Sequence, residues 1–227
     1  MLNKASVLLL FLFVVLFSSI SAITLKEAFD AAEPQEGYDK FLQLNTGETY
    51  TGGLLIGKLF DQRTAQLYGE EGLNVRIQGN GAILDLQGSE ICISCCENIL
   101  DIEDCIIING NVRFRGMNNS LFDQRPWGSV RYVTFYQPHD YGIRLQGAGE
   151  NILIERNIIV DAVATGSDYI FTTGISTDWL PTGSAIAISV FTGFYGTPVI
   201  QDNWTFHYDT EANSDSLRHI IELCEYG

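Results

Sequence analysis

The sequence predicts an all-β domain in which the chain winds through short parallel strands, a solenoid with one coil per repeat. Glycine is frequent, with 22 residues among 227, and short β-branched and apolar runs alternate with turn-forming residues. Similar segments recur with a period in the low twenties, which indicates a repeat architecture. Hydrophobic residues make up 46% of the chain and charged residues 18%, so a substantial core can form and the chain is not a disordered acidic segment.

Residues 1–22 have the pattern of an export signal peptide. Lys4 supplies a short positive start, and residues 7–17 form an unbroken apolar run that is about half the length of a membrane span. Small residues up to Ala22 follow and would permit cleavage there. Since no later apolar run is long enough to span a bilayer, we expect a secreted, periplasmic or cell-surface product with no membrane insertion after cleavage.

The mature chain is predicted to open with a short amphipathic helix within residues 23–37. Leu25, Phe29 and Ala32 fall on one helical face, and Pro34 would end the helix. Such a helix would cover the first coil and block end-to-end growth, so we expect it to cap a repeat domain over residues 38–227. No comparable element follows the last strand signal. We therefore expect either a fragment of a longer protein, truncated at its C-terminal end, or a last coil that pairs with some other element.

The repeat can be followed as an apolar anchor residue and a turn residue three positions later. The turn residues recur 21–30 residues apart along the chain. These spacings predict about seven coils of a parallel β-helix, stacked at about 4.8 Å per coil. At the turn, asparagine amides would point inward and bond to one another and to the backbone. The anchor and turn pairs are Ile77/Asn80, Ile102/Cys105, Tyr132/Phe135, Ile154/Asn157, Ile175/Asp178, Ile200/Asn203 and Ile221/Cys224, with a loop at 117–127 in the longest gap.

Two stretches resemble the right-handed parallel β-helix superfamily, the group of pectate lyases and other proteins that act on polysaccharides. One runs from Phe41 to Ile56 and continues into Val75–Leu86, and the other is the Asn-Ile-Leu-Ile-Glu-Arg-Asn-Ile-Ile-Val segment at 151–160. The resemblance covers about residues 40–224. It implies a right-handed β-helix, but it specifies function poorly because the superfamily holds lyases, hydrolases, epimerases and non-enzymatic proteins.

Cysteines are concentrated in one stretch. Cys92, Cys95, Cys96 and Cys105 lie close together and Cys224 is distant. Neighbouring strand residues such as Cys95 and Cys96 point to opposite faces, which argues against a shared metal ion. The sequence leaves open buried free thiols, one disulfide that includes Cys92, Cys95 or Cys96, or a metal site.

The charge balance restricts the partners. With 13 basic and 28 acidic side chains and a net charge of −15, the chain is unsuited to nucleic acid or an anionic membrane. Residues 111–160 are the exception, with six arginines against four carboxylates. An acidic saccharide could therefore meet the protein at this band, and we expect a monomer with a polysaccharide or glycan as its partner.

The candidate catalytic residues lie in this band, around the loop 136–142. His139, Asp140 and Tyr141 combine a histidine, a carboxylate and a phenol, the groups that move protons in lyases and epimerases. The segment is similar to the Asp-Pro-His-Asp motif of mannuronan epimerases, with Gln137 in place of the first aspartate. His139 or Tyr141 would carry the proton, and Arg131 or Arg144 would balance a uronate. The alternative interpretation is an ordinary turn.

Three further sets complete the candidate site. Arg131 and Arg156 fall near equivalent points of neighbouring coils and could read sugar carboxylates, or could be solvated charges paired with nearby acids. Trp127 and Trp179 could stack on sugar rings or be buried under loops. A series of aspartates, Asp161, Asp168, Asp178, Asp202 and Asp209, could hold Ca²⁺ or only bond to turn backbone, so no cofactor is certain and no metal ligand is assigned.

Together these observations favour an exported β-helix protein that binds an acidic polysaccharide and, if it is an enzyme, modifies it by lyase or epimerase chemistry. The competing interpretation is a non-catalytic surface or adhesion module in which the repeat is only a scaffold.

Overall fold

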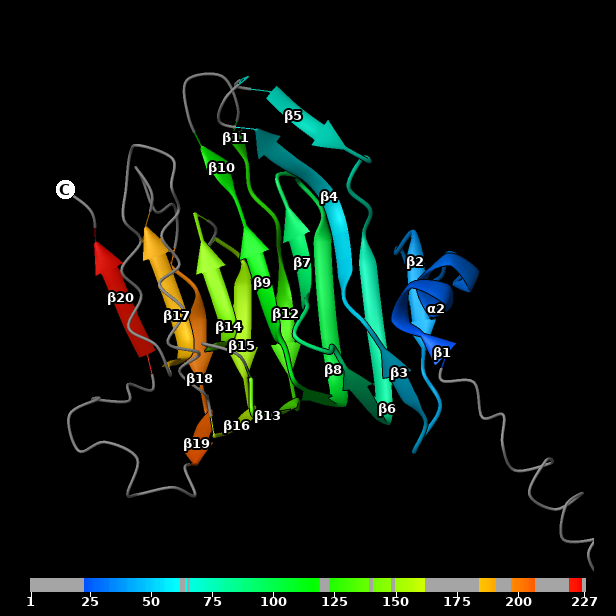
Figure 1. The fold of residues 1–227 in the computed structure, drawn as a ribbon. Helices are drawn as coiled ribbons and strands as arrows, with labels where there is room; N and C mark the ends of the chain where they lie inside the picture. The colour runs from blue at the N-terminus through cyan, green and yellow to red at the C-terminus, as the bar shows by residue number, and fades with distance from the viewer. Residues whose placement is uncertain are drawn as a thin grey trace, which may run out of the picture.

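The computed structural model describes residues 23–61, 64, 66–118, 123–138, 141–147, 150–161, 184–190, 197–206 and 221–225. The expected signal peptide at 1–22 lies outside these residues, as do Ile175 and Asp178 of the repeat. Within them the structure is all-β apart from one short helix, and its strands run mostly in parallel (Figure 1). None of the described helical residues belong to a helix long and apolar enough to cross a membrane.

The first sheet holds eleven strands that pair in parallel. Its main path runs β1-β3-β6-β8-β12-β15-β18, while β2 pairs with β6 and the chain β8-β13-β16-β19 continues alongside. The strands are β1 (Ile23–Thr24), β2 (Lys40–Gln43), β3 (Thr49–Thr51), β6 (Val75–Asp85), β8 (Ile99–Ile108), β12 (Trp127–Arg131), β13 (Thr134–Tyr136), β15 (Ile152–Glu155), β16 (Ile158–Val160), β18 (Val199–Gln201) and β19 (Trp204–Phe206).

The second sheet holds seven strands in the order β20-β17-β14-β9-β7-β4-β5, all parallel except for the β4–β5 hairpin. The chain therefore alternates between the two sheets as it advances. The strands are β4 (Leu54–Asp61), β5 (Gln66–Gly69), β7 (Glu90–Ser94), β9 (Asn111–Arg115), β14 (Tyr141–Gln146), β17 (Ser184–Val190) and β20 (Ile221–Glu225).

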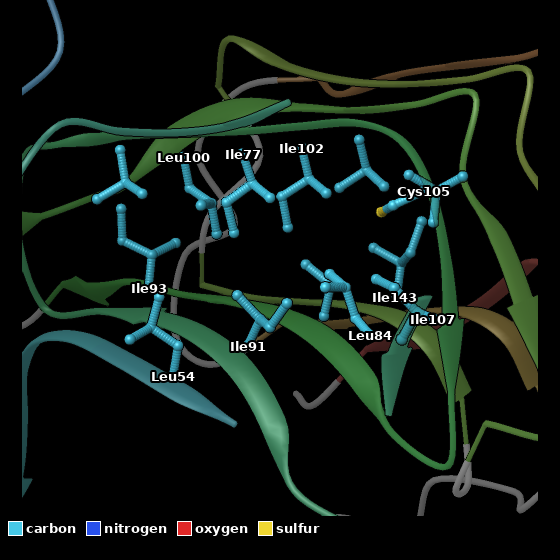
Figure 2. Close-up of a cluster of buried hydrophobic side chains, with 14 of the residues drawn as sticks. Leu54, Ile77, Leu84, Ile91, Ile93, Leu100, Ile102, Cys105, Ile107 and Ile143 are labelled. Atoms are coloured by element: carbon cyan, nitrogen blue, oxygen red, sulfur yellow. The ribbon is translucent and has the colours of Figure 1, made fainter. Parts of the chain in front are cut away.

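The core fills the space between the sheets, because every second residue of each strand points inward. On the first sheet the anchors Ile77, Ile102 and Ile154 stand in one row, as the repeat predicts. On the second sheet Ile91 and Ile143 fill an equivalent row. Figure 2 shows these side chains gathered in one apolar cluster.

Three of the predicted repeat assignments are wrong. Between Ile102 and Ile154 the anchor is the buried Val130, and Val133 is the turn residue, whereas the ring of the expected anchor Tyr132 is exposed. The first turn of the predicted repeat, within β6, is two residues longer than the next turn, within β8, so Ala82 rather than Asn80 lies opposite Cys105. Ile221 and Cys224 belong to β20 of the second sheet and not to the row of Ile200.

Corners in the first sheet are made by residues with left-handed backbone. Asp104, Tyr132, Arg156 and Asp202 have φ between 54° and 56°. Each immediately precedes an inward-pointing turn residue. The left-handed residue interrupts the inward–outward alternation of side chains, so the strand segments before and after it can bend around the core. A tyrosine and an arginine in this region are uncommon, since aspartate, asparagine and glycine adopt it at lower cost.

Asparagine amides satisfy the backbone inside two of these corners. Asn157 is fully buried and its Nδ2 donates to the Oδ1 of Asn203 at 2.9 Å and to the carbonyl of Val130 at 2.9 Å. Asn203 in turn donates to the carbonyl of Ile154. This confirms the inward amides predicted at the turn for these two residues. Asn80 also bonds to backbone, at the carbonyl of Leu44, but from the longer first turn.

One helix, α2 (Leu25–Ala31), precedes the repeats. Thr24 caps it and forms a capping box with Glu27, while Leu25 and Phe29 are buried in the core. It occupies only part of the 23–37 segment, because the backbone is already extended at Ala32. The expected loop at 117–127 contains a small antiparallel hairpin, β10 (Met117–Asn118) and β11 (Asp123–Gln124).

Candidate functional site

Three arginines meet on the face of the second sheet that points away from the core. Arg113 and Arg144 stand opposite each other on β9 and β14, and Arg115 lies two residues beyond Arg113 on the same face. They alternate with the core residues Val112 and Phe114, which fixes their direction. We call Arg113, Arg115 and Arg144 the arginine cluster.

Polar and aromatic groups surround the arginine cluster. The NH1 of Arg113 lies 3.6 Å from a Glu90 oxygen, and its NH2 bonds to Gln146. The guanidinium of Arg144 lies 5.5 Å from the centre of the Tyr141 ring, which is a cation–π distance. The Arg113 side chain is only 12% exposed. The cluster is therefore held in fixed positions and partly removed from water.

Burial and mutual repulsion shape the electrostatics of this cluster. Burial lowers the pKa of Arg115, and the neighbouring charge of Arg113 lowers it further. Burial also raises the pKa of the Tyr141 phenol, so this group is a neutral hydrogen-bond donor at physiological pH. The arrangement offers closely spaced guanidinium groups beside a phenol, a combination suited to a carboxylate-bearing ligand.

The predicted site residues are divided between the two sheets. Tyr141 and Arg144 come together on the second sheet. Arg131 and Trp127 lie on β12 of the first sheet. Trp127 is the first residue of this strand, and its side chain is exposed. The positions of His139, Asp140 and Trp179 are outside the described residues. The structure thus places Tyr141 and Arg144 together on the second sheet, apart from Trp127 and Arg131 on the first sheet.

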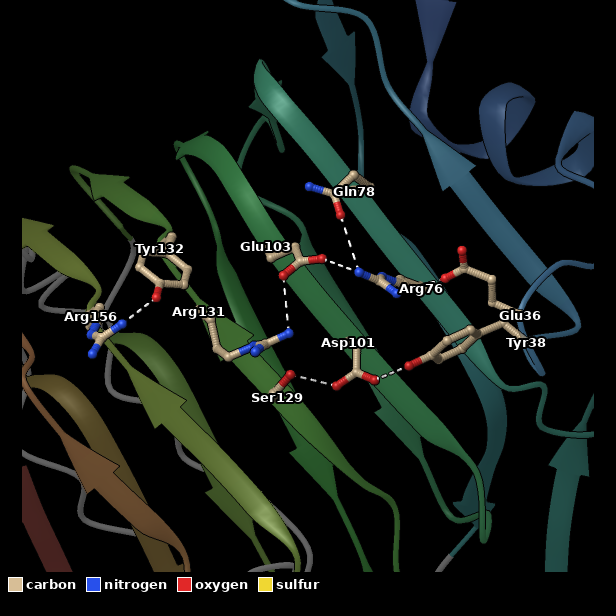
Figure 3. Close-up of polar contacts among 10 residues, drawn as sticks. All are labelled: Glu36, Tyr38, Arg76, Gln78, Asp101, Glu103, Ser129, Arg131, Tyr132 and Arg156. Atoms are coloured by element: carbon tan, nitrogen blue, oxygen red, sulfur yellow. Dashed lines mark hydrogen bonds and ion pairs between the residues drawn. The ribbon is translucent and has the colours of Figure 1, made fainter.

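A second polar group lies on the outward face of the first sheet (Figure 3). Glu103 on β8 is its centre, with a side chain only 14% exposed. One of its oxygens binds the NH2 of Arg76 on β6, and the other binds the NH2 of Arg131 on β12 at 3.0 Å. Arg76 also reaches Glu36 at 3.1 Å. Each arginine here therefore has a carboxylate partner. We call these residues, together with the neighbouring Tyr38, Asp101 and Ser129, the outer network.

Asp101 occupies the neighbouring row of the outer network. One of its oxygens accepts from the Tyr38 hydroxyl and the other from the buried Ser129 hydroxyl. Burial raises the pKa of Tyr38 to about 12, and the hydrogen bond that its hydroxyl donates to Asp101, together with the negative charge of Asp101, adds to this rise. Tyr38 and Glu36 follow α2 in the chain, so the outer network joins the N-terminal segment to the first sheet.

The predicted stripe of Arg131 and Arg156 does not form. Arg131 stands opposite Glu155, whereas Arg156 comes one residue later, at a corner. Arg156 stacks over the Tyr132 ring at 5.5 Å, bonds to its hydroxyl and approaches Asp202 at 3.9 Å. A shift of one residue turns a side chain to a different direction, so spacing alone aligned the two arginines wrongly.

Sequence reasoning overlooked several residues of these sites. Arg76, Asp101 and Ser129 form one row, and Gln78, Glu103 and Arg131 form the next. Each stands directly before or after an anchor of the repeat. Placing the anchors Ile77, Ile102 and Val130 in register is therefore the signal that would have found them.

The described thiols are buried and free. Cys92, Cys95, Cys96 and Cys105 form no disulfide in the structure. Burial raises the pKa of Cys92 to about 12 and that of Cys96 to about 11, which makes both poor nucleophiles at neutral pH.

The described residues contain no group of three or more histidine, cysteine, aspartate or glutamate side chains that could hold a metal ion. Of the aspartates considered for Ca²⁺, Asp161 and Asp202 are described, and they follow β16 and β18 at different corners. Asp168, Asp178 and Asp209 lie outside the described part of the chain.

Comparisons with family models, with curated proteins and with solved structures find no match to this chain. The geometry described above is therefore the basis for a functional proposal.

Proposed function

We propose that the chain is an exported right-handed parallel β-helix protein that binds an acidic polysaccharide at the arginine cluster. The parallel rows of both sheets, the alternation of the chain between them and the residues that resemble the β-helix superfamily support the fold. In this fold α2 is the cap of the first coil, and about seven coils make up the domain.

The observation that carries the binding proposal is the placement of Arg113, Arg115 and Arg144 on one outward face. Like charges on adjacent strands repel and partial burial increases the cost, which the Glu90 carboxylate 3.6 Å from Arg113 offsets only in part. A bound carboxylate would offset both, because a guanidinium can donate two parallel hydrogen bonds to it. A polymer of uronate sugars presents carboxylates at regular intervals along its length. The arginine cluster is thus a suitable reading surface for such a polymer.

If the protein is catalytic, the same site favours lyase or epimerase chemistry. Arginines that neutralise a uronate carboxylate acidify the adjacent ring proton, which a base can then remove. In a lyase the electron pair forms a carbon–carbon double bond and expels the glycosidic oxygen, which takes up a proton. In an epimerase a proton returns to the opposite ring face. Tyr141 is the described phenol beside the arginines, and His139 and Asp140 precede it directly in the chain.

The outer network favours the second candidate function, a non-catalytic binding module. Glu103 already neutralises Arg76 and Arg131, so neither arginine is available to balance a uronate. Asp101 binds two hydroxyl groups of the protein itself. The polar residues of the outer network therefore stabilise the fold, and recognition of a uronate is left to the arginine cluster.

The test compares polyuronate binding by the wild type, Arg113→Gln and Arg115→Gln, with Arg125→Gln as the matched control. Arg125 is an arginine of the same chain segment that pairs with Glu150 at 3.3 Å on the surface. Affinity electrophoresis in gels containing polygalacturonate or alginate measures binding, and circular dichroism confirms folding. We expect binding to weaken at least tenfold in both cluster variants and to persist in the control. Failure of the folded wild type to bind either polymer, or equal binding by all variants, would refute the proposal.

Catalysis is tested separately by the ultraviolet absorbance of unsaturated sugar products, with and without Ca²⁺, and by exchange of solvent deuterium into the polymer. Product absorbance indicates a lyase, and deuterium uptake without chain cleavage indicates an epimerase. Binding with neither signal supports the non-catalytic module.

A further inference from the structure

Apolar side chains line the outward face of the first sheet beyond its corners. Two neighbouring rows cross β8, β13, β16 and β19, which lie side by side (Figure 1). One row contains Ile106, Thr134, Ile158 and Trp204, and the other contains Ile108, Tyr136 and Val160. We call Ile106, Ile108, Tyr136, Ile158, Val160 and Trp204 the apolar stripe.

Much of the apolar stripe is exposed, although the opposite face of β8, β13 and β16 is buried. Trp204 is 75% exposed, Ile158 46% and Tyr136 42%, while Ile107, Phe135 and Ile159 on the other face are inaccessible. A monomeric protein in water gains nothing from leaving contiguous large apolar residues on a flat sheet. An occupant that covers them would gain the hydrophobic free energy of that contact.

The size of the apolar stripe argues against a second protein as the occupant. Four strands at about 4.8 Å each and a width of about 10 Å give roughly 200 Å². A stable protein–protein interface needs about 800 Å² on each partner. A narrow, elongated partner fits the dimensions better than a second copy of this chain.

Charges along the borders argue against an acidic occupant. Asp104 and Asp202 stand at the corner that precedes the apolar stripe. Asp85, the last residue of β6, stands opposite Ile108 at one end of the stripe, and Asp161 directly follows β16 at its other edge. Arg156 is the cation at the first border, and it lies near Asp202. The carboxylates would repel a polyuronate but can accept hydrogen bonds from hydroxyl groups.

We propose that the apolar stripe binds a neutral glycan chain, with Trp204 and Tyr136 as stacking platforms for sugar rings. The two aromatic residues are two strands apart and occupy adjacent rows, so their centres are separated by roughly 12 Å. This separation is comparable to the repeat of two sugar units in an extended glycan. Ile158 lies on the strand between them and contacts the intervening sugar, while the bordering carboxylates accept hydrogen bonds from the hydroxyl groups of the glycan. The site is independent of the arginine cluster, which lies on the second sheet.

The experiment measures binding of cellohexaose, xylohexaose and hexa-N-acetylchitohexaose to the full chain by isothermal titration calorimetry. Trp204→Ala and Tyr136→Ala remove the two platforms. Tyr68→Ala is the matched control, because Tyr68 is an exposed aromatic residue on β5, outside the apolar stripe, and its exposure lies between those of Tyr136 and Trp204. Oligogalacturonate is titrated in parallel into the same variants and into Arg115→Gln.

We expect at least one neutral oligosaccharide to bind, with affinity at least tenfold lower in each platform variant and unchanged in Tyr68→Ala. Oligogalacturonate binding should respond to Arg115→Gln and not to Trp204→Ala, which separates this proposal from the polyuronate site. The proposal is overturned if no neutral probe binds the folded protein, or if the platform variants bind as the wild type does. A dimer in sedimentation equilibrium that Trp204→Ala dissociates would also overturn it, because the occupant would then be a second copy.

Discussion

Replacement of Asn157 by alanine tests the corner design of the first sheet most directly. The Asn157 side chain has no exposed surface and makes three hydrogen bonds. Its Oδ1 accepts from the backbone N–H of Val133 at 3.0 Å, and its Nδ2 donates to Val130 and to Asn203. Alanine removes all three bonds at a place that water does not reach.

The expected loss follows from those contacts. Each hydrogen bond contributes about 1 kcal/mol, and a buried group left without a partner costs a further 1–3 kcal/mol. The substitution leaves the N–H of Val133 buried without a hydrogen-bond partner. We therefore expect Asn157→Ala to lower the free energy of unfolding by about 3–5 kcal/mol. Asn203 is only partly buried, so water replaces some of its bonds, and Asn203→Ala should cost about 1–2 kcal/mol.

Reversible urea unfolding followed by far-ultraviolet circular dichroism measures these differences. Asn45→Ala is the control, because the amide of Asn45 bonds to Glu48 on the exposed surface and its loss should cost less than about 0.5 kcal/mol. A double-mutant cycle of Asn157 with Asn203 should show a coupling above about 0.5 kcal/mol. A loss below about 1.5 kcal/mol for Asn157→Ala, or an equal loss for Asn203→Ala, would show that the buried amide does not hold the corner.

Three other predictions follow from the polar and thiol groups. Glu103→Gln leaves Arg76 and Arg131 without the carboxylate that separates them, so the urea midpoint should fall by the equivalent of about 2 kcal/mol, and added salt should reduce the difference; an unchanged midpoint would contradict this. The pKa of Tyr38 is raised from 10.0 to about 12, so its neutral form stabilises the wild type fully below pH 10 and this contribution is lost as the pH rises to 12. Tyr38→Phe should lack this alkaline loss of stability, and a parallel decline in both proteins would count against it. The buried thiols Cys92, Cys95, Cys96 and Cys105 should react with a thiol reagent at pH 8 only after urea unfolds the protein, and rapid labelling of the native protein at these positions would disprove their burial.

The sequence was sufficient to predict the strand-rich repeat because inward apolar residues recur with a regular period. Ile77, Ile102, Ile154 and Ile200 stand in one row as expected. The prediction was wrong where a corner departed from the common length. Two additional residues in the first turn moved Asn80 out of the shared position, and the long insert before β12 concealed Val130 as the anchor.

The candidate sites were harder to predict because they depend on side-chain direction. In a strand the direction alternates at each residue, so an error of one position exchanges the two faces. Arg131 and Arg156 illustrate this, since the left-handed corner at Arg156 separates two charges that the spacing had placed together. The pairing of Arg113 with Arg144 was equally hidden, because the residues are far apart in sequence and only the register of β9 with β14 joins them.

In stacked parallel strands, outward residues at the same register position form a row across the sheet. Such a row offers a polymeric ligand the same kind of side chain at regular intervals. Glu103 balances Arg131 of its own row and Arg76 of the neighbouring row, which leaves these two rows little charge to offer to a ligand. Arg113 and Arg144 place like charges side by side in another row, and Ile158 and Trp204 place apolar groups in a further row. A polymer gains contacts from every unit that fits such a row, so weak contacts add along its length. Under the two binding proposals made above, the charge of each row, rather than the shared scaffold, decides which polymer it binds, so that one fold would hold an acidic and a neutral glycan on different sheets.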